Sequence, residues 1–298
     1  MNKKWLYADL SLVLVALVWG STFVVIKDTL SHAKPLGFMA LRFILATVIL
    51  GGIFNKKLRQ SNKSEIRAGA IIGVILYLGL LIQTIGLIYT TASKQAFLTA
   101  VYVVIVPFLV WIIYKKPPDS YSIIGAILAL IGIGFLTIDG SFRVDSLNKG
   151  DMLTLCCALF FAGHIVSIGY FAKDMEPIVL SIVQFGVTAL LFLVSALIVE
   201  GSKYILQPNT LKAALYLALV GTVFAYTVQN VAQKYTSSTH AAIILSLESV
   251  FGTILGVYIL GEIMTREMII GCIVIFVGII ITETKLEFIK VKREEDSY

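Results

Sequence analysis

The sequence predicts an all-α polytopic membrane protein, in which ten transmembrane helices form two inverted five-helix repeats around a central cavity. Three observations lead to this prediction. Apolar residues make up 58% of the 298 residues and charged residues only 14%, whereas a soluble domain is nearer to half apolar and a quarter charged. About ten apolar runs are long enough to cross a bilayer, and the chain repeats itself.

The apolar runs match the roughly 20 residues that an α-helix needs to cross the hydrocarbon core of a bilayer. Pro35, Pro177 and Pro208 stand at or just before the start of a run, where a proline's missing N–H costs nothing. The first run follows basic residues as in a signal peptide, but it is too long and lacks a small-residue cleavage site, so we expect it to be retained. The expected spans are 7–27, 35–54, 68–90, 94–114, 119–138, 151–172, 177–199, 209–233, 239–261 and 266–284.

The duplication is visible in two polar segments of the same pattern. Residues 89–96 read Tyr-Thr-Thr-Ala-Ser-Lys-Gln-Ala, and residues 235–242 read Tyr-Thr-Ser-Ser-Thr-His-Ala-Ala. This offset of 146 residues persists downstream, whereas upstream the offset is 142, so a four-residue insertion separates the two blocks. The matched pairs are Gly125 with Gly271, Gly132 with Gly278, Asp9 with Asp151, Pro35 with Pro177 and Phe43 with Phe185.

The offsets divide the chain into a first repeat at 1–140, a second repeat at 141–285 and a cytoplasmic tail at 286–298. Five spans per repeat is an odd number, so the second repeat should enter the membrane upside down relative to the first. Inverted repeats of this kind are found in many secondary transporters, with the binding site near the midplane.

The charged residues predict the orientation of the chain. Fifteen lysines and arginines lie in the loops on the side of the amino terminus and eight on the other side, which places both termini in the cytoplasm and the protein in the cytoplasmic membrane. The basic pI near 9.1 therefore indicates topology and not a nucleic-acid partner. Lipid is the expected environment, and the sequence does not predict an oligomeric state.

Several classes of function are excluded. The three cysteines, Cys156, Cys157 and Cys272, lie in apolar runs without a C-x-x-C spacing, so we expect neither a disulfide framework nor a metal site. No H-E-x-x-H, G-x-S-x-G or Walker motif is present. The sequence therefore predicts no enzyme, no ATP hydrolysis and no cofactor.

Arg42 and Glu248 are the deepest ionisable residues in the apolar runs. A charge at the bilayer centre costs about 2.5–3.5 kcal/mol on insertion scales, so both should face an aqueous cavity or each other. Counting residues from the span ends places them roughly 8 Å apart along the membrane normal. They can form a structural ion pair, bind opposite ends of a zwitterion such as an amino acid, or act separately, with Glu248 as a cation or proton site.

Other polar and aromatic residues at mid-span are candidates for the cavity wall. Tyr102 and Gln184 occupy the positions equivalent to Glu248 and Arg42, and His164 the position equivalent to Thr22. Helix packing and interhelical hydrogen bonds are the alternative roles for these residues. The remaining candidates are Trp19, Ser21, Thr22, Tyr77, Gln83, Gln95, Tyr226, Gln229 and Asn230.

A series of short motifs follows the order of the spans. The motifs are Trp19-Gly20-Ser21-Thr22-Phe23 with Lys27, Arg42-Phe43, Ala96-Phe97-Leu98 through Tyr102 and Pro107, Leu247-Glu248 and Leu260-Gly261-Glu262. In these motifs the sequence resembles the EamA family of the drug/metabolite transporter superfamily, in two units at about 9–138 and 151–284. Ser249 stands where that family often has proline. The resemblance implies a ten-helix carrier in which spans one to four and six to nine surround the cavity and the fifth and tenth are peripheral.

The expected function is secondary active transport of small metabolites, amino acids or drug-like compounds across the cytoplasmic membrane by alternating access. Export is the usual direction in the family that the chain resembles, and a proton bound at Glu248 is the candidate coupling ion. The alternatives are a narrower carrier of an organic cation or a phosphorylated metabolite, and a non-transporting membrane protein such as a scaffold or an intramembrane enzyme.

Overall fold

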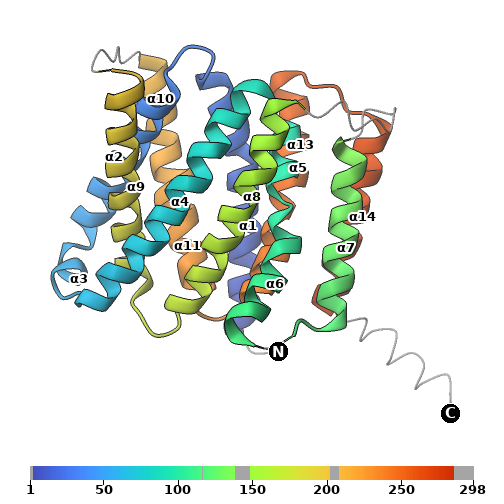
Figure 1. The fold of residues 1–298 in the computed structure, drawn as a ribbon, viewed down its shortest axis with the longest axis horizontal. Coiled ribbons are helices and arrows are strands. Elements are labelled where there is room, and N and C mark those ends of the chain that lie inside the picture. The colour runs from blue at the N-terminus through green and yellow to red at the C-terminus, as the bar shows by residue number, and fades with distance from the viewer. Residues whose placement is uncertain (1–2, 116, 138–147, 202–207, 285–298) are drawn as a thin grey trace.

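A computed structural model describes residues 3–115, 117–137, 148–201 and 208–284, and within these ranges every regular element is helical (Figure 1). The tail predicted at 286–298 lies outside them. The helices are α1 (Lys3–Thr29), α2 (Pro35–Ile53), α3 (Asn55–Arg59), α4 (Lys63–Tyr89), α5 (Ala92–Thr99), α6 (Tyr102–Tyr114), α7 (Ser120–Thr137), α8 (Lys149–Phe171), α9 (Pro177–Val199), α10 (Pro208–Tyr216), η2 (Leu217–Phe224), α11 (Ala225–Ala232), α12 (Ser238–Leu245), α13 (Leu247–Leu260) and α14 (Arg266–Thr284).

Eight stretches of helix in the described chain are long and apolar enough to cross a membrane, and two shorter apolar helices accompany them at 120–132 and 269–278. Each coincides with one of the ten apolar runs of the sequence. The protein is therefore an all-helical, multi-pass membrane protein. The eight stretches are Trp5–Thr29, Pro35–Ile53, Lys63–Tyr89, Ala92–Tyr114, Lys149–Phe171, Pro177–Val199, Pro208–Ala232 and Ser238–Leu260.

Three of these stretches are not continuous α-helices, which the apolar pattern did not indicate. One of them, Pro208–Ala232, contains the π-helical turn η2 between α10 and α11. The run at 94–114 breaks between α5 and α6, where the Val103 amide donates to the Ala100 carbonyl at 3.0 Å. The run at 239–261 breaks at Ser246, whose carbonyl accepts from the Ser249 amide at 3.1 Å. These tight i to i−3 bonds narrow the helix for one turn. Ala100 and Ser246 are 146 residues apart, the offset of the downstream repeat.

The repeated polar segments prove to be helix starts. The side chain of Thr91 accepts a hydrogen bond from the Lys94 amide and caps α5. Ser237, 146 residues later, accepts in the same way from the His240 amide and caps α12. An N-cap satisfies an amide that has no partner within its helix. The residues that reveal the duplication therefore have equivalent local roles in the two halves.

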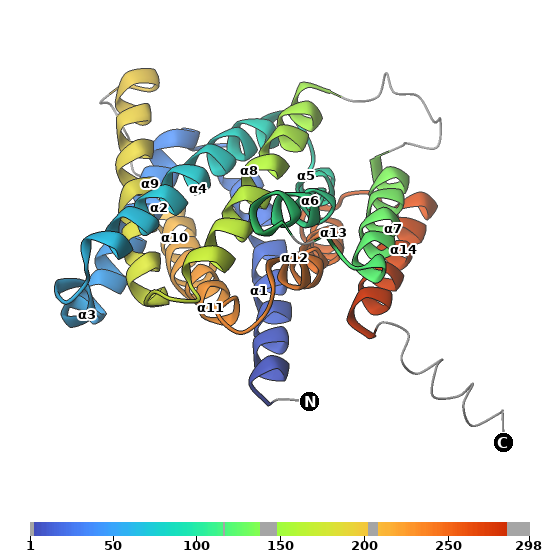
Figure 2. The ribbon, with the colours of Figure 1, turned by 60° about the horizontal axis from the view of Figure 1, so that its bottom comes forward.

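Helices α7 and α14 stand side by side at one edge of the molecule (Figures 1 and 2). They pack through glycines in a reciprocal pattern. A Cβ atom on Gly132 would lie 2.7 Å from the Gly271 carbonyl oxygen, and one on Gly278 would lie 2.9 Å from the Gly125 carbonyl oxygen. The four glycines found by the 146-residue offset therefore form one close-packed seam.

We expect Gly132→Ala to lower the thermal unfolding midpoint of the purified protein, because the added methyl group has to push the two helices apart. Overpacking of this kind costs about 1–3 kcal/mol. Gly134→Ala, on the same helix, is the matched control, since nothing lies within 4 Å of its Cβ position. Equal unfolding midpoints for the two variants, measured by scanning fluorimetry in detergent, would show that α7 and α14 are not closely packed at Gly132.

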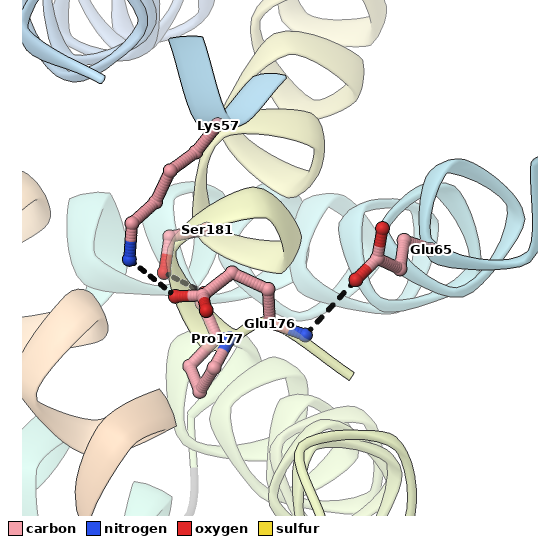
Figure 3. A network of polar contacts seen from close by, with 5 residues as sticks. All are labelled: Lys57, Glu65, Glu176, Pro177 and Ser181. Atoms are coloured by element: carbon pink, nitrogen blue, oxygen red, sulfur yellow. Dashed lines mark hydrogen bonds and ion pairs between the residues drawn. The ribbon is translucent and has the colours of Figure 1, made fainter. Parts of the chain in front are cut away.

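Carboxylates hold the start of α2 and of α9 to other elements. Glu65 of α4 accepts from the Glu176 amide at 3.1 Å, and the Glu176 side chain lies 3.0 Å from Lys57 of α3 (Figure 3). Glu200, which follows α9, accepts from the Leu36 and Gly37 amides of α2 at 2.8 and 2.9 Å. A negative charge at a helix N-terminus is favourable. Because each of these contacts joins segments more than 100 residues apart, they connect the two halves of the chain.

Candidate functional site

A small buried cavity lies among the membrane-spanning helices, and its lining residues in the described chain do not include any from α7 or α14. Its volume is about 30 Å³, room for roughly two water molecules. The lining residues come from both halves of the chain: Trp19, Thr22, Phe23, Ile26, Arg42, Leu80, Gln83, Thr99, Tyr102, Phe161, His164, Ile165, Tyr226, Gln229 and Glu248.

Arg42 enters the cavity from α2 and is held by the π-helical turn η2. Its Nε donates to Thr222 Oγ1 at 2.7 Å and its Nη2 to the Gly221 carbonyl at 3.2 Å. A π-helical turn departs from the i to i−4 bonding of an α-helix, and here the Gly221 carbonyl accepts from side chains. A Cβ on Gly221 would lie 2.9 Å from Thr22 Cγ2, so glycine is needed at this close approach.

Glu248 enters the cavity from the broken ninth span. It is the second residue of α13, directly after the break at Ser246, and is only 3% exposed. The N-terminal end of a helix favours a negative charge. The Tyr102 hydroxyl lies beside the carboxylate but has no hydrogen-bond partner of normal geometry. A carboxylate and a phenol are thus placed side by side at the wall of the cavity.

Arg42 and Glu248 line the same cavity but do not form an ion pair with each other in the described chain. The sequence left this possibility open. Instead, the guanidinium is bonded to neutral oxygens, which leaves its positive charge uncompensated by a carboxylate. The cavity therefore holds two buried side chains of opposite formal charge that are not paired with each other.

Aromatic rings form the wall between these groups. The rings of Trp19 and Tyr226 have their centres 4.8 Å apart, and His164 meets Tyr226 edge-on at 5.6 Å. Trp19 Nε1 also donates to the Gly221 carbonyl at 3.3 Å, which fixes the indole beside Arg42. Rings that are held in this way form a fixed apolar part of the cavity wall.

Nine of the fourteen candidates from the sequence line the cavity: Trp19, Thr22, Arg42, Gln83, Tyr102, His164, Tyr226, Gln229 and Glu248. Gln83 donates to Thr99 Oγ1 at 3.1 Å within the wall. The Oε1 atom of Gln229 is buried without a hydrogen-bond partner in the described protein. An unsatisfied polar atom at such a wall is a place where a ligand or a water can bind.

The other five candidates lie outside the cavity wall and bond to neighbouring side chains. Ser21 meets the Tyr216 hydroxyl at 2.6 Å, and Tyr77 meets Ser195 Oγ at 2.5 Å. Gln184 Oε1 lies 3.0 Å from His164 Nε2, and Asn230 donates to Ser181 Oγ at 2.8 Å. Gln95 donates to the Gln83 carbonyl and accepts from Thr154. In this structure these residues join helices, and Gln95 and Gln184 support residues of the wall.

The sequence reasoning missed Thr99, Phe161, Gly221 and Thr222. The pair Gly221-Thr222 interrupts the apolar run at 209–233, as Gly20-Ser21-Thr22 interrupts the first, and this signal could have been used. Phe161 carries no such signal, because one phenylalanine in an apolar run looks like any other. Thr99 is likewise placed in the wall only by the break between α5 and α6.

A buried cavity lined by polar and aromatic side chains of broken, membrane-spanning helices is an arrangement typical of polytopic helical membrane transporters. Residues 6–138 and 148–284 match the EamA-like transporter family, and the chain belongs to this family. The two matches begin 142 residues apart and end 146 residues apart, the same offsets that relate the halves of the sequence.

Comparison with individual proteins agrees with the family. An "Uncharacterized transporter" of Archaeoglobus fulgidus is 36% identical over 95% of this chain and 88% of its own length. A "Probable amino-acid metabolite efflux pump" of Salmonella typhimurium is 28% identical over 90% of this chain and 92% of its own, and one of Escherichia coli with the same name is 26% identical. A chain solved by crystallography shares the fold with a TM-score of 0.74 at 16% identity, covering 95% of this chain and 98% of that one.

Proposed function

We propose that the protein is a secondary active transporter that carries a small zwitterionic metabolite, of the amino-acid type, across the cytoplasmic membrane. The observation that carries this proposal is the separate placement of Arg42 and Glu248 in one buried cavity. A zwitterion supplies a carboxylate for the guanidinium and an ammonium group for the carboxylate. Such a ligand compensates both charges at once, which is valuable because unpaired charges inside a membrane protein are costly.

The rest of the cavity fits the body of such a substrate. Trp19 and Tyr226 offer aromatic faces, and Gln83, Tyr102 and Gln229 offer hydrogen bonds near the charged groups. The name "amino-acid metabolite efflux pump" given to two relatives supports the same substrate class and an outward direction. We therefore place the direction of transport from the cytoplasm outward.

The mechanism that we propose is alternating access between two inverted five-helix repeats, with both termini in the cytoplasm. The contacts between helices support this mechanism, because they occur in equivalent pairs. When each helix of one contact is replaced by its counterpart 142 or 146 residues away, the other contact of the pair results. α1 packs on α13 as α8 packs on α6, and α4 packs on α9 as α2 packs on η2. The present cavity is too small for an amino acid, so a substrate can enter only when these helices move apart on one side.

Counterflow in proteoliposomes tests the substrate class. Purified protein is reconstituted, the vesicles are loaded with an unlabelled compound, and uptake of its labelled form is measured. The panel comprises individual amino acids, choline as an organic cation and glucose 6-phosphate as a phosphorylated metabolite. We expect amino acids to exchange and Arg42→Gln to abolish the exchange, whereas movement of choline or the sugar phosphate alone would establish one of the narrower alternatives.

Accessibility to thiol reagents tests the non-transporting alternative. Single cysteines at positions 19, 42, 102 and 248, in a background without Cys156, Cys157 and Cys272, should react with a membrane-impermeant reagent if the cavity opens to water. Failure of all four to react, together with no counterflow, would favour a scaffold. Chemical conversion of an added metabolite would favour an enzyme.

We expect Thr222→Val to raise the substrate concentration at half-maximal counterflow by roughly 10- to 150-fold. The valine removes the oxygen that accepts from Arg42 Nε, and a hydrogen bond to a charged group is worth about 1.5–3 kcal/mol. Thr47→Val is the matched control, because the Thr47 hydroxyl donates to the Phe43 carbonyl of its own helix. Equal values for the two variants would show that Thr222 does not position Arg42.

A further inference from the structure

A second, larger hollow lies away from the central cavity, between the first part of α1 and α11. It measures about 370 Å³ and is bordered by Tyr7, Ala8 and Ser11 on α1 and by Thr227, Val231 and Ala232 on α11. Its walls are mostly apolar side chains. Nothing in the central site accounts for it, since the two sets of lining residues have no member in common.

The other half of the chain closes the equivalent position. The offsets of 142 and 146 residues pair Ala8 with Gly150 and Ala232 with Gly86. A Cβ on Gly150 would lie only 2.5 Å from the Gly86 carbonyl oxygen, so α8 and α4 pack there backbone against backbone. Alanine methyl groups prevent the same approach between α1 and α11. The groove therefore exists in one half because two alanines stand where the other half has glycines.

The groove opens toward the bilayer. Leu10 and Leu14 on α1 and Val231 on α11 are among the exposed large hydrophobic residues of the molecule, at 57%, 47% and 40% exposure. In a membrane-spanning protein such side chains face acyl chains, so hydrocarbon and not water is the medium at the mouth of the groove. Tyr7 and Tyr235 border the groove at the amino-terminal end of α1, and aromatic residues are common at the headgroup level of a membrane.

The charges near that end favour an anionic headgroup. Lys234 is exposed, lies two residues after the end of α11 and precedes Tyr235 of the groove. This end of the molecule is the one with the larger share of lysine and arginine in the sequence. Asp9 on α1 lies 3.1 Å from His240 Nε2, so its carboxylate has a partner. One basic residue near the surface contributes measurably to the binding of anionic lipid.

We infer that this groove, defined by α1 and α11, is a binding site for one anionic phospholipid, with an acyl chain between Ala8 and Ala232 and the phosphate at Lys234. The inference depends on the membrane-spanning fold and on the broken symmetry of the glycines. It does not depend on the proposed substrate, and its readout is lipid binding alone.

Native mass spectrometry of the full chain in detergent, titrated with phosphatidylglycerol or with phosphatidylcholine of the same acyl chains, tests the site. We expect one phosphatidylglycerol to be retained in preference to phosphatidylcholine. Ala232→Phe fills the groove and should abolish this retained lipid, whereas Ile198→Phe, at a 78% exposed position on α9, should keep it. Retention by Ala232→Phe at the wild-type level would overturn the proposal.

A second variant avoids any change in the packing of the groove. Lys234→Gln is at an exposed position and should reduce the preference for phosphatidylglycerol by about fivefold, the usual contribution of one basic residue, without changing the melting midpoint. Equal affinity of the wild-type protein for the two lipids, or an unchanged preference in Lys234→Gln, would overturn the assignment of the headgroup.

Discussion

Exchange of Glu248 for glutamine is expected to abolish transport driven by a proton gradient. Glutamine has nearly the same shape, but it can neither carry a proton nor balance an ammonium group. The side chain is 3% exposed and faces the cavity beside Tyr102, so water cannot replace the lost charge. The substrate should also bind less tightly. A charge-assisted hydrogen bond is worth about 1.5–3 kcal/mol, so the substrate concentration at half-maximal uptake should rise roughly 10- to 150-fold.

The measurement is uptake into proteoliposomes with and without an imposed proton gradient. Asp174→Asn, in the exposed connection between α8 and α9, removes one carboxylate away from the cavity and should behave as wild type. Full dependence on the proton gradient in Glu248→Gln would remove this residue as the coupling site. An unchanged substrate concentration at half-maximal uptake would also remove it from substrate binding.

A single methyl group on Gly20 is expected to destabilise the protein strongly and to abolish transport with it. A Cβ there would lie 2.7 Å from Phe251 Cβ and 2.8 Å from the Gly252 amide nitrogen. Two of the obstacles are a Cβ and a backbone atom, which no change of rotamer can move, so α1 has to shift away from α13. The cost of such overpacking is about 1–3 kcal/mol, and we expect the upper end.

The consequence for the site follows from the elements involved. α1 carries Trp19 and Thr22, and α13 carries Glu248, so separating the two helices widens the cavity at its charged wall. Gly52→Ala on α2 is the matched control, since nothing lies within 4 Å of its Cβ position. Similar melting midpoints for Gly20→Ala and Gly52→Ala in detergent would show that the α1–α13 contact is looser than described.

Much of the candidate site could be anticipated because charge in an apolar run is a strong signal. Arg42 and Glu248 were singled out by their depth alone, and the structure places both in one cavity. Neutral polar residues were harder to sort. Gln83 and Gln95 are both buried amides in adjacent segments, but only Gln83 reaches the wall. Their sequence surroundings do not show which way each side chain points.

The sequence by itself determined the helical, multi-pass character of the protein and its internal duplication. The length of an apolar run and the spacing of a repeat can both be read along the chain, because neither depends on how the helices pack. The ten apolar runs all contain helices of the structure, and the repeated polar segments cap helices at equivalent places. Both results follow from the need of a chain in lipid to satisfy its backbone within each span.

Only the tertiary structure decided how the charges are held and where the symmetry fails. The contact between Arg42 and the Gly221 carbonyl joins residues 179 positions apart, and its acceptor lies in the π-helical turn η2. The open groove beside Ala8 and the closed contact beside Gly150 differ by a methyl group on each of two helices. Such features arise from close packing between distant segments, and packing depends on the complete set of neighbours and not on the pattern along one helix.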